Sequence, residues 1–381
     1  MAVTTVQSNN SLIQFTRDIN REFVRQNMFS PFMGTGMNAI IRIRQEPKKG
    51  GEQMNIPLVT KLTGKGVGRG PLVGNEERID NYGMRLWIDW ARHAVVTTAA
   101  EKQKDNALVF NEARPMLSDW GREVQRDELI EALMALPSES APAAQGSDDG
   151  DRVNGIRWEA SSAGQRTSWL TANSDRVVFG SAIGNFSTTF ATAAANVDTA
   201  ADRLTSSSLS LLERVAEQAS PAIRPYQLRD GYESYVLFAG TNTYRDIFDD
   251  LKSIHKDAMP RSSSNPLFRP GDLQYNNVLV RKVPQISSFV TNIWTDLQTA
   301  GAGGNTRIEP VFLCGQQAAV FGWGQMAKPV TRKEDDYGFI DGRGISMAYG
   351  VGKTFKKHPM GGSALKQWGV VTAFFAAPSD A

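Results

Sequence analysis

Cysteine and histidine are scarce in this sequence, and their scarcity excludes several kinds of protein. The 381 residues include one cysteine and three histidines. A single cysteine cannot form a disulfide within the chain, so the protein is not a small secreted domain held together by disulfides. The same count leaves few ligands for a zinc site. We therefore expect neither a metal nor another cofactor.

Long apolar runs are also absent. No stretch approaches the roughly 18 consecutive apolar residues that a membrane span needs. The first ten residues are polar and lack the apolar core of a signal peptide. We expect no membrane association. The chain is long enough for a sizeable core and for more than one domain.

Charge is balanced overall but not along the chain. With 42 basic and 40 acidic side chains, the net charge is +2, which argues against a dedicated nucleic-acid binder. The first 70 residues, however, carry ten basic and four acidic side chains. Such a segment can contact nucleic acid, or it can contact the acidic remainder of a neighbouring copy. The plain alternative is solvated surface charge without any partner.

The stretches that resemble catalytic or nucleotide-binding motifs do not match those motifs in full. The run Gly352-Lys353-Thr354 resembles the end of a phosphate-binding loop, but Met347 stands where that motif needs glycine. We instead predict an exposed basic loop from Lys353 to His358. The alternating glycines of residues 64–70 do not follow the dinucleotide-binding spacing. Cys314 lies in an apolar run and is predicted to be a small buried side chain. The sequence therefore predicts no enzyme.

The periodicity of apolar residues predicts mixed helices and strands without regular alternation, which is an α+β fold. Residues 137–155 are predicted to be a linker or an exposed excursion. A glycine-rich stretch at 63–71 lies between two extended runs and is expected to project as a long hairpin-like loop. We predict helices at 11–29, 107–136, 205–219, 244–258 and 316–325, and strands at 38–46, 54–62, 84–98, 235–239, 277–283, 286–294, 308–314 and 369–377.

Two neighbouring stretches carry a family resemblance. The first, residues 62–77, contains the glycine-rich loop and ends in a G-x-E-E turn at Gly74–Glu77. The second, residues 82–95, contains a strand of the form hydrophobic-x-D-x-x-R-x-A, with Asp89 and Arg92 at the two charged positions. In these motifs and in the order of elements from about residue 11 to 377, the chain resembles the major capsid proteins of N-four-like tailed phages.

This resemblance implies the Hong Kong 97-type capsid fold and a division of the chain. Residues 1–50 would form the N-terminal arm, and residues 51–98 the extended E-loop with its flanking strands. Residues 99–220 would form the peripheral domain, with its long spine helix and a variable insertion at 137–203. Residues 221–360 would form most of the axial domain, and residues 361–381 would return to the peripheral domain.

The function implied by the resemblance is that of a major capsid protein. Copies would assemble into hexamers and pentamers that form an icosahedral head shell around double-stranded phage DNA, without sequence-specific binding. The other implied partners are a separate scaffolding protein, a portal and cement or decoration proteins. Assembly would take place in the host cytoplasm, and the product would be the virion.

The resemblance also implies a subunit interface on the E-loop. Its basic residues would pair with acids on the next copy, each pair contributing little, while many repeated contacts add up in a closed shell. Some members of the fold join a lysine of this loop to a neighbour's asparagine, and we expect no such bond here. The alternatives are a DNA-binding protein that uses the basic N-terminal segment and an enzyme with a site assembled from distant residues. We predict the interface residues Lys61, Lys65, Arg69, Glu76, Glu77 and Arg78.

Overall fold

The computed structural model describes most of the chain in two compact units. One unit contains Ala91–Gln125 and Gln325–Met347, and the other contains Met28–Trp90, Arg126–Gly324 and Ala348–Ala381. Four elements pass from one unit into the other, namely β5 (Asp89–Thr98), α2 (Ala113–Met134), β14 (Ala319–Thr331) and β15 (Ile340–Lys353). The described residues are 27–45, 52–59, 61–62, 64–77, 79, 81–104, 109–227, 233–258, 268–269, 272–332, 336–357 and 365–380.

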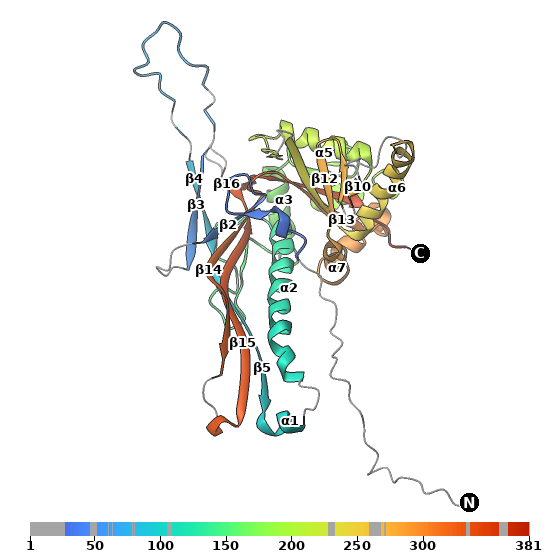
Figure 1. The fold of residues 1–381 in the computed structure, drawn as a ribbon. Coiled ribbons are helices and arrows are strands. Elements are labelled where there is room, and N and C mark those ends of the chain that lie inside the picture. Colours follow the sequence, from blue (N-terminus) through green and yellow to red (C-terminus); the bar gives the residue numbers. More distant parts are fainter. Residues whose placement is uncertain are drawn as a thin grey trace, which may run out of the picture. The chain divides into compact units, whose positions relative to one another are not determined.

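A sheet of long strands is built around β14 and β15. Its order is β1-β2-β14-β15-β5, and a short strand β6 pairs with β15. The long helix α2 (Ala113–Met134) and the short helix α1 (Ala99–Lys104) follow β5 along the chain (Figure 1). The strand bounds are β1 Met33–Gly34, β2 Ile41–Gln45, β5 Asp89–Thr98, β6 Val153–Asn154, β14 Ala319–Thr331 and β15 Ile340–Lys353.

A second sheet lies wholly in the larger unit and has the order β10-β11-β12-β9-β13-β18-β7. Every residue of β13 and β18 is buried, which is typical of strands that are covered on both faces. Its strands are β7 Val177–Phe179, β9 Glu233–Ala239, β10 Phe268–Arg269, β11 Asp272–Tyr275, β12 Val278–Lys282, β13 Ile308–Cys314 and β18 Val370–Ala376, with β8 (Tyr226–Gln227) beside β9.

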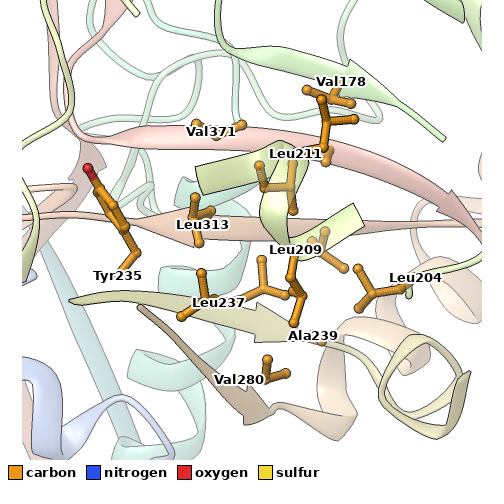
Figure 2. Packing of buried hydrophobic residues seen from close by; sticks show 14 of the residues in the cluster. Val178, Leu204, Leu209, Leu211, Tyr235, Leu237, Ala239, Val280, Leu313 and Val371 are labelled. Atoms are coloured by element: carbon orange, nitrogen blue, oxygen red, sulfur yellow. The ribbon is translucent and has the colours of Figure 1, made fainter. Parts of the chain in front are cut away.

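Helices supply the apolar side chains that cover this sheet. Leu209 and Leu211 of α5 (Ser206–Gln218) pack in one cluster with Leu237 of β9 and Leu313 of β13 (Figure 2). The same cluster includes Ile247 of α6. The other helices of this unit are α3 Ala163–Ala172, α4 Phe190–Ala195, α6 Thr241–Ala258 and α7 Pro284–Asn292, and the short 3-10 helices are Ser30–Phe32, Ile183–Asn185, Thr295–Gln298 and Ala302–Gly304.

Most predicted elements are found near their predicted positions. Helix α2 occupies the predicted range 107–136, and Pro115 lies in its first turn, where a missing N–H breaks no helical hydrogen bond. Cys314 is completely buried, as predicted. The predicted helix at 11–29 lies outside the described residues, except for its last three positions, which are not helical. None of the helices that the structure describes has the length and apolarity to cross a bilayer.

Three predictions are wrong. The predicted strand at 286–294 is helix α7, which Pro284 begins and which buries Ile286, Phe289 and Val290 at helical spacing. The predicted helix at 316–325 is mainly strand β14, because residues from Ala319 pair in parallel with β2. The predicted exposed basic loop begins in the core instead: Lys353 ends β15 at 2% exposure, and Lys356 lies in β16 (Phe355–Lys357) at 5%.

Candidate subunit interface

The predicted loop extends from a hairpin whose inner face is buried. Strands β3 (Gln53–Val59) and β4 (Asn81–Trp87) pair antiparallel over their full length, from Gln53 opposite Trp87 to Val59 opposite Asn81. Burial alternates strictly along β3, as expected of a strand with one face covered. The buried residues of the hairpin join Val320 and Phe355 in one apolar cluster: Met54, Ile56, Leu58, Met84 and Leu86.

The lower end of the hairpin is fastened by one buried amide side chain. The Trp87 backbone N–H donates to Asn154 Oδ1 at 2.7 Å, and Asn154 Nδ2 donates to the Trp87 carbonyl at 3.0 Å. Asn154 thus reproduces, with a side chain, the pair of bonds that a neighbouring strand would make. Gly350 of β15 lets its backbone lie close to Trp87, because a Cβ at this position would lie 1.9 Å from the Trp87 oxygen.

The aspartate of the strand motif has a structural role. Asp89 is buried and accepts backbone N–H bonds from Trp90, Gly146 and Asp151 at 2.8, 3.0 and 2.9 Å. Burial alone would raise the pKa of Asp89, but these three donors and the nearby Arg152 hold it below its usual value. The carboxylate therefore holds the excursion at 137–155 against the start of β5.

A second polar anchor joins that excursion to the hairpin's upper half. The Tyr82 hydroxyl donates to Glu139 Oε1 at 2.7 Å, and Lys357 Nζ lies 3.3 Å from Glu139 Oε2. Burial and the adjacent carboxylate raise the pKa of Tyr82. The hydroxyl therefore remains a donor throughout the physiological range. Both ends of the hairpin are held, and the loop between its strands projects from a fixed support.

The loop itself is exposed, and three of the predicted interface residues lie on it as unpaired cations. Lys61, Lys65 and Arg69 are exposed or nearly so. Among the described residues, none of the three takes part in an ion pair. Figure 1 shows the connection leaving the ends of β3 and β4. Arg78, the sixth predicted residue, lies outside the described residues.

The two predicted glutamates serve the loop's own backbone. Glu77 Oε2 accepts the Gly64 N–H across the loop at 2.7 Å, and Glu76 Oε2 accepts the Gly74 N–H at 2.7 Å. Gly74 has φ = +87°, a conformation that glycine adopts without strain. The Glu77 carboxylate thus connects the two ends of the loop, and both glutamates bind backbone groups of their own chain.

Sequence reasoning missed the apolar part of this surface. Leu62, Leu72, Val73 and Ile79 are between 57% and 84% exposed, although large apolar side chains are usually buried. The signal was available, because these residues flank a stretch too rich in glycine to build a core around them. Exposed apolar residues gathered on one loop are typical of a surface that another protein covers.

No group of histidine, cysteine and acidic side chains within the described parts of the chain has the arrangement of a metal site. What the hairpin offers is a contact surface, with apolar side chains, cations and a fixed base. Such an arrangement is typical of a surface that contacts another protein.

Comparison with known proteins identifies the kind of assembly. The chain matches the family described as "Phage capsid protein" over residues 3–378. The capsid protein of cyanophage Pam1 is 32% identical over the whole of both chains, with a TM-score of 0.84. No curated protein sequence matches the chain.

More distant capsids share the fold alone. The capsid of Ralstonia phage GP4 is 16% identical over the whole of both chains, with a TM-score of 0.70. The head of Helicobacter pylori bacteriophage KHP40 is 14% identical over 97% of this chain and 96% of that one, with a TM-score of 0.65. The chain therefore belongs to the phage capsid protein family, has the Hong Kong 97-type fold and forms the shell of a phage head.

Proposed function

We propose that this major capsid protein assembles into hexamers and pentamers, and that the loop between β3 and β4 is the E-loop that joins each copy to the next. The observation that carries the proposal is the loop's group of exposed apolar residues, on a loop that extends from a hairpin with one buried face. Burying apolar area contributes about 25 cal/mol per Å². The glycines beside these residues let one loop follow neighbours set at slightly different angles.

The cations of the loop can form ion pairs that fix how two copies are oriented at this contact. Lys61, Lys65 and Arg69 have no acidic partner among the described residues, so acids on an adjacent copy can pair with them. Each exposed pair is worth about 0.2–1 kcal/mol. Since every copy in a closed shell makes the contact, these small terms accumulate.

We propose the division of the chain that the resemblance implies, with one change. Residues 1–50 are the N-terminal arm, residues 99–220 the peripheral domain with α2 as its spine helix, and residues 221–360 most of the axial domain. Strand β18, within residues 361–381, pairs with β13 along its full length, so we place it with the second sheet and not with the peripheral domain. The buried strands β9, β13 and β18 support an axial domain built around that sheet.

The remaining partners follow from the role. We propose that the shell encloses double-stranded DNA without reading its sequence, that a separate scaffolding protein directs assembly in the host cytoplasm, and that a portal and cement proteins complete the head. Membership of a structural family favours a protein without catalytic activity. The alternative of a DNA-binding protein has no support from the family or from the structural relatives.

A deletion tests the role of the loop. Removing residues 64–70 should leave a folded subunit, because the buried face of the hairpin is untouched, but it should prevent shell closure. Sedimentation and electron microscopy of the product would show subunits or open capsomers in place of shells. Normal closed shells from this variant would overturn the E-loop assignment.

A gentler pair of variants separates the apolar contact from loop length. Replacing Leu72 and Val73 by serine keeps the loop intact, and we expect shells to form at least about tenfold more slowly. The matched control replaces Ile183 and Ile293, which are also exposed but lie outside the loop. Equal slowing in the two double variants would count against a specific loop contact.

A further inference from the structure

A hollow lined by apolar and aromatic side chains opens on the smaller unit. Its volume is about 520 Å³, and all of its lining residues belong to that unit. The lining includes the rings of His93 and Trp120, whose centres lie 4.8 Å apart, and the buried side chain of Leu117. Met116 and Val96 are more than half exposed at the hollow.

The surface around this hollow is typical of one that another molecule covers. Strand β5 is exposed at every position from Arg92 to Val96, whereas a half-buried strand alternates. The exposed run includes Val95 and Val96, which continue the apolar character of the hollow. An isolated subunit gains nothing from leaving such residues in water, but a subunit of a shell has neighbours to cover them.

The same unit carries an aromatic side chain that lies entirely in solvent. Tyr337 is completely exposed in the turn between β14 and β15. Its φ is +51°, and that of Asp336 is +47°, so two consecutive residues other than glycine occupy the left-handed region. This conformation is unfavourable for both and persists where the surrounding structure fixes it, as it often does at functional positions.

Backbone hydrogen bonds hold the described part of this turn, residues 336–339, on which Tyr337 lies. The Phe339 N–H donates to the Asp336 carbonyl at 2.9 Å, and the Ala99 N–H of α1 donates to the Phe339 carbonyl at 2.8 Å. Lys102 of α1 also pairs with Asp341 of β15. The turn and α1 therefore lie at the same end of β5 and β15, as Figure 1 shows within this unit.

Charge near the hollow favours this partner. Lys102 and Glu101 line the hollow and are already paired, with Asp341 and Lys104 respectively. Arg343, whose guanidinium carbon lies 4.8 Å from the centre of the Phe110 ring, has no ion pair among the described residues and is the excess cation there. The tyrosine is preceded directly by the carboxylate of Asp336, so a tyrosine that enters the hollow brings that carboxylate toward Arg343. Its ring meets other aromatic rings at the edge or face.

We propose that Tyr337 of one copy inserts into this hollow on a second copy of the chain. Tyr337 and the hollow lie at different places on the same unit, so the contact joins two unlike surfaces. Such a contact closes a ring when the rotation from one copy to the next is a whole fraction of a turn. The inference rests on the shell-forming role of the protein. It adds a contact separate from the E-loop, with Phe110, Met116 and Trp120 as the receiving residues.

Site-directed disulfide formation tests this contact directly. The native Cys314 is completely buried and should not form a disulfide, so any disulfide observed involves the engineered cysteines. Subunits with Tyr337→Cys are assembled together with subunits of different mass that carry Met116→Cys, and the shells are then oxidised. We expect a disulfide-linked pair with one copy of each variant, because a disulfide requires Cα atoms about 4.4–6.8 Å apart.

The other outcomes overturn the proposal. Closed shells in which Tyr337→Cys links only to itself would show that the turns meet each other, and closed shells without linked pairs would show no contact. A link from Tyr337→Cys to a different protein would assign the turn to that partner. Wild-type chains that never form shells would instead contradict the capsid role itself.

A second set of variants needs no disulfide. Tyr337→Ser should lower the temperature at which shells come apart by several degrees while the unfolding of free subunits stays unchanged, and Met116→Arg should do the same by blocking the hollow. Tyr337→Phe keeps the ring and should behave as wild type. Ile183→Ser, at an exposed position of the other unit, is the matched control. Shells of Tyr337→Ser as stable as wild type would refute the contact.

Discussion

At the scale of single residues, two buried polar side chains determine much of the architecture. Asn154 supplies both hydrogen-bonding groups that the Trp87 backbone needs, and Asp89 gathers three N–H donors. Asp89 belongs to the strand motif, but the motif does not indicate which groups its carboxylate binds, and Asn154 is one polar residue among many in the sequence. Their roles depend on backbone groups brought together from segments about 60 residues apart, so local patterns could not predict them.

Replacing Asn154 by alanine should destabilise the subunit. The substitution leaves the N–H and carbonyl of Trp87 without their partners, at a cost of about 1–3 kcal/mol for each buried group. Urea unfolding of unassembled protein measures the loss in the free energy of unfolding. Asn75→Ala is the control, because Asn75 is exposed and bonds only within the loop, and we expect a change within about 0.5 kcal/mol. Equal effects at the two positions would contradict the anchoring role.

The burial of Lys353 was not predicted from the sequence, which indicated an exposed basic loop. A glycine-rich run followed by lysines usually lies on the surface, yet Lys353 is buried at the end of β15, and its Nζ has no hydrogen-bond partner among the described residues. The nearest aromatic ring, that of Trp169, is centred 5.7 Å from Nζ. Burial lowers the pKa of Lys353 to about 7.

The lowered pKa predicts how stability depends on pH. Between about pH 7 and the ordinary lysine value, the unfolded chain binds a proton at Lys353 that the folded chain does not. The free energy of unfolding should therefore rise with pH in this range, by at most about 1.4 kcal/mol per unit. Lys353→Met should remove this contribution and make the protein more stable at pH 7. Urea unfolding at pH 7, 8 and 9 measures the difference between variant and wild type, with exposed Lys61→Met as control; identical slopes in all three proteins would contradict the account.

At the scale of elements, the pattern of apolar residues predicted best where an element has one buried face or is buried throughout. Helices α5 and α6 and the buried strands β9, β13 and β18 were all found close to their predicted ranges. Periodicity failed for α7, where β-branched residues suggested a strand although Pro284 and the spacing of Ile286, Phe289 and Val290 are helical. It failed for the start of β14, where pairing with β2 outweighs local preference.

Ion pairs link helix α2 to the segment of residues 151–157, which contains the end of the excursion at 137–155. Arg152 pairs with Glu128 at 2.6 Å, and Arg157 contacts both Glu131 and Asp151. The first pair is largely buried, with the Glu128 and Arg152 side chains 8% and 14% exposed. This segment contains Asn154, so the ion pairs hold the residue that fastens the hairpin.

A double-mutant cycle tests the coupling between helix and segment. Glu128→Ala and Arg152→Ala should each lower the free energy of unfolding by about 3–5 kcal/mol, because each leaves a buried charge without its partner. The double variant should lose clearly less than the sum of the two. Strictly additive losses, measured by urea unfolding, would show that the pair is not coupled. The exposed pair of Lys104 and Glu101 is the matched control, with an expected coupling of about 0.3–0.5 kcal/mol.

At the scale of the whole molecule, the candidate interface was predicted in part. The glycine-rich composition of residues 64–70 indicated an exposed loop, and its cations suggested a partner. The exposed apolar residues and the bonds from Glu76 and Glu77 to the loop's own backbone were not predicted, because they depend on how the loop closes on itself. The receiving surface of the neighbour is also beyond sequence reading, since residues from several elements meet only in the folded unit.

Charge is distributed in keeping with self-assembly. The first 70 residues hold the basic excess, while the net charge of the whole chain is only +2. Under the proposed function, the basic segment would find complementary charge on other copies, and the small net charge favours weak binding to DNA. Neighbouring copies would also cover both exposed apolar regions, one on each unit.

Electron microscopy of particles formed by the full-length chain tests this account most directly. The protein is expressed alone and together with a scaffolding protein, and the products are imaged. We predict closed icosahedral shells whose subunits show the loop between β3 and β4 lying on an adjacent copy. A chain that stays monomeric under every condition, or shells in which this loop contacts no neighbour, would contradict the central claim.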